Sequence, residues 1–152
     1  RIGRRAAMKR CFLNMLALSS GFTFIYVLVQ LVGVSVFVDM DILISKHFYQ
    51  NMIFYYIAVF IIFSFGGVCY LLFYVITRLK IVSLLMAVAV NLYMVYYLKI
   101  DNLYFGLTVI DTMSLGGSVQ AVIWFSKRVR DIAITTGIYM LADVVYEKRD
   151  IV

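Results

Sequence analysis

The sequence predicts an all-α integral membrane protein: a bundle of four transmembrane helices followed by an amphipathic helix. Hydrophobic residues make up 64% of the chain and charged residues 14%, against about 45–50% and about 25% in soluble domains. Most of the 152 residues fall in four apolar stretches, each close to the length of a bilayer span, about 20 residues. The segments between these stretches differ in basic charge, as the loops of multi-pass membrane proteins do.

The predicted elements follow one another with short connections. Residues 1–10 form a basic N-terminal segment, and residues 11–126 form the transmembrane domain. Its four spans are expected at about 11–38, 52–77, 81–98 and 103–126. The links at 77–80 and 99–102 leave room for only a few residues, so neighbouring helices should run antiparallel.

The C-terminal segment, residues 131–146, has its apolar side chains on one helical face. These are Ile134, Ile138, Leu141 and Val145. Sixteen residues rise only about 24 Å, which is short of a span. We therefore expect an amphipathic helix on the inner membrane surface or against a partner, with a partly inserted fifth segment as the alternative.

The basic residues predict the orientation of the chain. Ten of them lie in the N-terminal segment, the turn at 78–80 and the segment after the fourth span, against two in the opposite loops. This distribution places both termini on the inside. The first residue is arginine rather than methionine; a cleaved transit peptide would leave such a basic start inside, which favours an organellar, mitochondrial inner membrane.

Asp111 is the most informative single residue, because a carboxylate within a transmembrane helix is a functional candidate. It lies eight residues into the fourth span, about 12 Å below the outer boundary. Asn91 and Gln30 fall at the same depth in their own helices, and Ser114 and Ser118 extend the Asp111 face. This polar layer is interpreted first as an interhelical hydrogen-bond cluster that fixes packing. There are two alternatives. The layer could bind a proton, a cation or a lipid headgroup, or Asp111 could contact a partner subunit.

Two further groups of residues have predicted roles. Small residues that let helices approach closely are Gly66, Gly67, Ala87, Thr112, Gly116 and Gly117. Basic residues expected to bind anionic lipid headgroups at the inner face are Arg4, Arg5, Lys9, Arg10, Lys127, Arg128 and Arg130.

The sequence contains no catalytic signature. The patterns GxSxG, HExxH, CxxC and the phosphate-binding loop are absent from it. His47, the only histidine, and the two cysteines offer no metal-ligand spacing. The basic clusters adjoin membrane segments, which argues against nucleic acid. We therefore expect no enzyme activity, no cofactor and no bound metal.

Residues 61–75, with the sequence IIFSFGGVCYLLFYV, resemble the glycine-containing third helix of a core membrane-arm subunit of respiratory complex I. The highly basic start of this chain is unlike that family, and no helix precedes the matching pair in the expected way. No residue role is therefore transferred from the resemblance.

The expected function is that of a non-catalytic membrane subunit that scaffolds or stabilises a larger complex. A respiratory or other energy-transducing organellar complex fits the basic inner start. Its partners would be other membrane subunits and anionic phospholipids. The alternative is a small oligomeric channel or transporter that uses the polar layer around Asp111.

Overall fold

The computed structural model describes residues 2–45, 48–96 and 118–148, and over these ranges the chain is all-helical, as predicted. The helices are α1 (Ile2–Phe37), α2 (Met40–Ser45), α3 (Phe48–Thr77), α4 (Lys80–Tyr96) and α6 (Ser118–Lys148).

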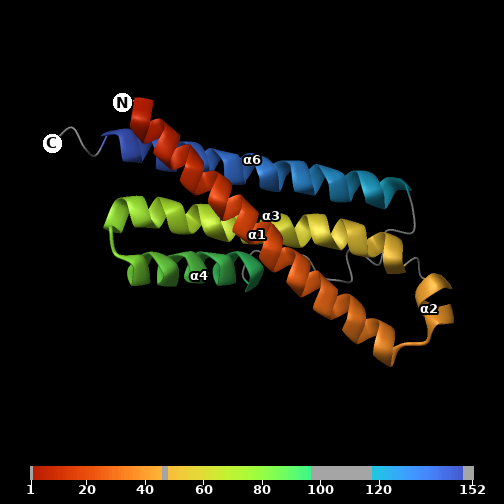
Figure 1. Cartoon of the computed structure of the whole chain (residues 1–152). Helices are drawn as coiled ribbons and strands as arrows, with labels where there is room; N and C mark the ends of the chain where they lie inside the picture. The colour runs from red at the N-terminus through yellow and green to blue at the C-terminus, as the bar shows by residue number, and fades with distance from the viewer. Residues whose placement is uncertain (1, 46–47, 97–117, 149–152) are drawn as a thin grey trace.

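Helix α3 lies at the centre of the bundle and packs against α1, α4 and α6 (Figure 1). α4 runs antiparallel to α3, α6 runs parallel to it, and α1 crosses it obliquely (Figure 1). The start of α1 and the end of α6 therefore lie at the same end of the bundle. The side of a membrane on which this end lies stays a prediction.

The turn between α3 and α4 is tight, as the short link predicted. Arg78 adopts a left-handed backbone conformation with φ of 59°, and its N–H donates to the carbonyl of Tyr74 at 2.9 Å. This geometry ends a helix and reverses the chain within two residues. The hydroxyls of Thr77 and Ser83 lie 2.9 Å apart across the turn, which joins the end of α3 to the first turn of α4.

The outer helices α1 and α4 bury several small side chains and expose many large apolar ones. α1 buries Ser19 and Thr23 together with Met8 and Val27, and α4 buries Ser83 and Ala87. The Thr23 hydroxyl donates to the carbonyl of Ser19 at 2.7 Å, and the Ser83 hydroxyl donates to that of Leu79 at 2.7 Å. The Thr23 hydroxyl therefore has its acceptor within α1, and the Ser83 hydroxyl has its acceptor just before α4 and lies beside the Thr77 hydroxyl of α3.

Gly66 and Gly67 let α4 and α1 approach α3 on two different sides. A Cβ on Gly66 would lie 3.0 Å from Nδ2 of Asn91 on α4, and a Cβ on Gly67 would lie 2.6 Å from Cγ of Met15 on α1. Ala87 belongs to the same region, where it packs with the buried Phe65 and Cys69. The structure thus places these small residues at helix contacts. Thr112, Gly116 and Gly117 lie outside the described residues.

Two helices of the described ranges are long and apolar enough to cross a membrane, judged by length and composition. They are Ala6–Phe37 within α1, with a mean hydropathy of 1.9, and Asn51–Thr77 within α3, with 2.4. The apolar part of α4, Lys80–Tyr93, is shorter. Most of the predicted fourth span, 103–126, lies outside the described residues, so the count of four spans stays a prediction.

The C-terminal region differs from the prediction. The sequence predicts a span that ends at 126 and a separate surface helix at 131–146, but α6 runs without interruption from Ser118 to Lys148. The intervening residues 126–131 contain neither glycine nor proline, and lysine and arginine are good helix formers. Charge alone therefore does not break the helix, which is about 46 Å long.

The glycine contact gives a test of the packing. Gly67→Ala should destabilise the fold by about 1–3 kcal/mol, because the added methyl group overlaps Met15 and the core tolerates little extra volume. Thermal unfolding in mild detergent measures the effect. Gly21→Ala is the matched control: no atom lies within 4 Å of its Cβ position, so it should be neutral or slightly stabilising. Equal effects of the two substitutions would contradict the contact.

Candidate functional site

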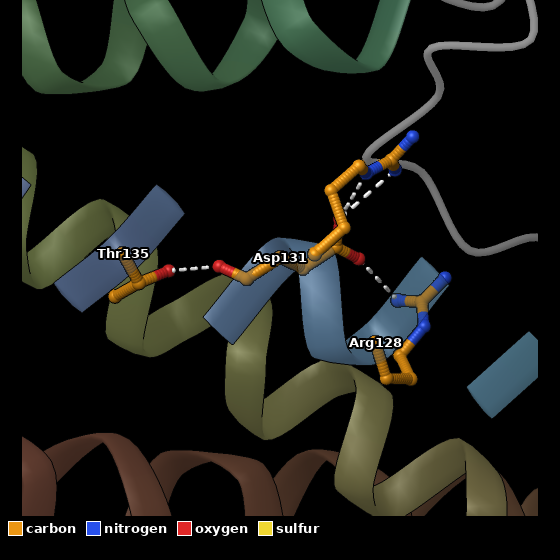
Figure 2. Close-up of polar contacts among 4 residues, drawn as sticks. Arg128, Asp131 and Thr135 are labelled. Carbon is orange, nitrogen blue, oxygen red and sulfur yellow. Dashed lines mark hydrogen bonds and ion pairs between the residues drawn. The ribbon is translucent and has the colours of Figure 1, made fainter. Parts of the chain in front are cut away.

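A charged cluster lies on the face of α6 that packs against α3. Asp131 is completely buried, although it was predicted to lie on a surface helix. Its Oδ1 accepts from Nε and Nη2 of Arg130 at 3.1 and 2.9 Å, and its Oδ2 lies 3.2 Å from Nη1 of Arg128 (Figure 2). One carboxylate therefore joins two guanidinium groups, and the cluster carries a net positive charge.

Aromatic and hydroxyl groups complete the cluster along the same helical face. The Arg128 guanidinium lies 5.7 Å from the centre of the Trp124 ring, a distance at which a cation–π interaction is favourable. Trp124 in turn meets Phe54 of α3 edge to face at 5.1 Å. One turn after Asp131, the Thr135 hydroxyl donates to the Asp131 carbonyl at 2.7 Å (Figure 2).

The cluster lies beside the middle of α3. Trp124 contacts Phe54 near the start of α3, and Ile138 packs against the Phe65 cluster further along. Because α3 and α6 run parallel (Figure 1), Asp131, which is midway between Trp124 and Ile138, faces the central part of α3. A lone charge at the centre of a membrane costs several kcal/mol, and pairing with the opposite charge lowers that cost.

The arrangement suits structural pairing better than chemistry. Arg128 is also almost completely buried, so neither group of the pair is placed to reach a substrate from solvent. No three acidic, histidine or cysteine side chains of the described residues gather in a way that would hold a metal ion. Buried ion pairs contribute little net stability, and this pair joins two residues of α6 rather than two helices.

The polar layer predicted around Asp111 is described only in part. Asn91 lies beside Gly66, and its Nδ2 donates to the Ala87 carbonyl of its own helix at 2.8 Å. Gln30 is exposed on α1. Asp111 and Ser114 lie outside the described residues, and Ser118 begins α6 with a side chain that is not described. The layer stays a prediction.

The residues predicted to bind headgroups differ in how far the structure exposes them. Lys9 and Arg10 are exposed on α1, and Lys127 is partly exposed on α6. Arg4 and Arg5 also lie in α1, but their side chains are not described. Arg128 differs from the prediction, because it is buried against α3 with Asp131 rather than exposed to a membrane surface. Arg130 is partly exposed, with a side-chain exposure of 30%, and pairs with the same carboxylate.

The spacing of the cluster residues along the sequence is that of one helical face, but the predicted break divided them between two elements. Buried positions recur along α6 at alternating intervals of four and three: Trp124, Arg128, Asp131 and Thr135. That spacing marks one face of a helix, and Arg128 and Asp131 within it are at the i, i+3 separation at which opposite charges meet. The predicted break between 126 and 131 separated the two residues and hid the pattern.

Comparisons with known proteins add no relative from which a role can be transferred. No family model, no curated protein and no solved structure matches the chain. Proposals about its function therefore rest on its own residues.

The ion pair gives a second test. Asp131→Leu alone should destabilise the fold by about 3–5 kcal/mol, because it leaves Arg128 buried without its carboxylate. The double variant Arg128→Met/Asp131→Leu should recover most of that loss, since it replaces both charges by apolar groups of similar size. A double-mutant cycle on unfolding in detergent measures the coupling.

The control for this cycle is Arg130→Gln. Its partly exposed guanidinium should contribute no more than about 1 kcal/mol. A double variant as unstable as the sum of its single substitutions would show that the two buried charges do not act as a pair.

Proposed function

We propose that the protein is a non-catalytic integral membrane subunit that packs against partner helices and stabilises a larger membrane complex. Its partners are other membrane subunits and anionic phospholipids. An energy-transducing organellar complex, with the basic start of the chain on the inner side of the membrane, is the proposed setting.

The observation that carries this proposal is that α1 and α4 bury hydroxyl side chains and expose large apolar ones. Thr23 and Ser83 are completely buried, whereas large apolar side chains of the same helices face outward, among them Leu18, Phe22 and Ile25 on α1 and Ile81, Leu84 and Leu85 on α4. A helix of a soluble protein has the opposite arrangement. Transmembrane helices pack through small residues and leave large apolar ones for lipid or for neighbours.

The extent of this outward apolar surface supports a partner-binding role. Monomeric soluble proteins rarely expose contiguous apolar patches larger than a few hundred Å². Here outward apolar residues recur along α1 from Leu13 to Phe37 and along α4 from Ile81 to Tyr93. Both helices therefore offer a long surface to neighbouring helices within a bilayer.

The interior of the described bundle favours a scaffold over a channel. The central helix α3 has apolar side chains with exposures of only 0–1%, namely those of Ala58, Phe65 and Val68. The buried Thr23 hydroxyl donates to a carbonyl of α1, and the buried Ser83 hydroxyl donates to the Leu79 carbonyl just before α4. The channel or transporter alternative depends on Asp111, which lies outside the described residues.

Photo-crosslinking in the native membrane tests the proposal. A photoreactive amino acid at Leu85, which is 64% exposed, should give an adduct with another membrane protein of fixed identity. The same probe at Ser83, which is completely buried on the same helix, should give only crosslinks within the chain. Both experiments follow extraction of membranes with alkaline carbonate, which an integral protein resists.

The native mass of the assembly in mild detergent completes this test. The expected result is a hetero-complex of fixed stoichiometry, heavier than the 17.5 kDa chain. Release of the chain by carbonate, or a homo-oligomer without partners, would contradict the proposed function.

A further inference from the structure

An open apolar groove runs between α1 and α4, with α3 as its floor. Its volume is about 770 Å³, and its lining includes Met15, Leu18 and Phe22 of α1 and Leu84, Val88 and Leu92 of α4. It exists because both helices pack on α3 through the sites at Gly66 and Gly67, which face different sides of that helix. The lining is almost entirely apolar.

A second cavity, of about 650 Å³, continues this groove to the end of the bundle where α3 passes into α4. The two cavities share the lining residues Cys11, Tyr70 and Leu71, so they adjoin each other. The second cavity has a polar rim. Tyr74, Tyr146, Arg78 and Lys80 contribute side chains that can hydrogen-bond or carry a positive charge.

The charge at this end is predominantly positive. Arg78 and Lys80 line the cavity, and Lys9 and Arg10 are exposed on α1 next to its lining residues Met8 and Cys11. The acidic residues on the nearby part of α6 are Asp143 and Glu147, both partly exposed. The two charged residues that line the cavity, Arg78 and Lys80, are both basic, so the rim attracts an anion.

The dimensions of the groove match one leaflet of a bilayer. The α1 residues along it run from Cys11 to Phe22, a rise of about 16 Å. This is about half of the hydrocarbon thickness of a bilayer, about 30 Å. The polar rim lies at one end of this length and the apolar groove extends from it, which is the distribution of polarity in a phospholipid.

We propose that the two adjoining cavities are a binding site for an anionic phospholipid, with an acyl chain in the groove between α1 and α4 and the phosphate at the rim formed by Arg78, Lys80, Tyr74 and Tyr146. The inference rests on the proposed membrane location. It goes beyond general attraction of basic residues to a membrane surface, because the groove holds one lipid in a fixed place. A lipid bound there covers apolar surface that α1 and α4 leave uncovered.

Native mass spectrometry of the full chain in mild detergent tests this site with two synthetic lipids. Dioleoyl phosphatidylglycerol is anionic, and dioleoyl phosphatidylcholine is zwitterionic with the same acyl chains. The chain should bind phosphatidylglycerol at least several-fold more tightly. Lys80→Gln should weaken phosphatidylglycerol binding several-fold and phosphatidylcholine binding less, because the choline ammonium of phosphatidylcholine offsets the charge of its phosphate. Equal affinity for the two lipids in the unchanged protein would overturn the proposal.

A matched pair of substitutions locates the acyl chain. Leu84 lines the groove and its neighbour Leu85 does not, yet both side chains are more than half exposed, so tryptophan at either position should be compatible with folding. Leu84→Trp should weaken binding of both lipids several-fold, and Leu85→Trp should weaken neither. Identical effects of the two variants would place the lipid elsewhere and overturn the proposal.

A photoreactive amino acid at Leu84 separates this proposal from the proposed function. A lipid adduct supports the site. A protein adduct at Leu84, from this chain or another, would overturn the lipid site while leaving a membrane subunit intact. Loss of the chain from carbonate-washed membranes would instead remove the basis of both.

Discussion

The close approach of α1 and α4 to the middle of α3 is the constraint on which the rest of the bundle depends. Glycine at positions 66 and 67 leaves the space that Asn91 and Met15 occupy, and the facing positions on the outer helices are also small, as at Thr23 and Ala87. Once small residues occupy the inward faces, the large apolar residues of α1 and α4 have only the outward faces left. The apolar exterior is thus a consequence of how the interior is packed.

The contacts on the two sides of α3 differ in chemical type. Towards α1 and α4 the contacts combine close approaches at Gly66 and Gly67 with hydroxyl and aromatic contacts between α1 and α3, such as that of Tyr26 with Tyr55, and an apolar groove stays open between α1 and α4. Towards α6 the rings of Phe54 and Trp124 meet edge to face, and a buried ion pair and a cation–π interaction lie within α6 beside this contact. The first side leaves apolar surface open between two helices. The second side buries charges that are paired within α6 itself.

The helical class and the tight turn at Arg78 were predictable because they depend on local composition and short links. Close helix contacts at Gly66 and Gly67 were predictable, because small residues permit close packing. The residues that they contact, Asn91 and Met15, were not, because they depend on tertiary geometry. The continuity of α6 was missed because the basic residues from Lys127 to Arg130 were interpreted as a loop. Helix propensity does not distinguish a charged residue in solvent from one paired inside a bundle, so the burial of Asp131 could not be inferred from its identity.

The position of Asp131 along α6 has a mechanical consequence. A slide of α6 by one helical turn, about 5.4 Å, would move the carboxylate and the Arg128 guanidinium together, because both belong to α6, and it would separate Trp124 from Phe54 of α3. An axial movement of α6 along α3 would therefore break the contact between Trp124 and Phe54 but leave the ion pair intact.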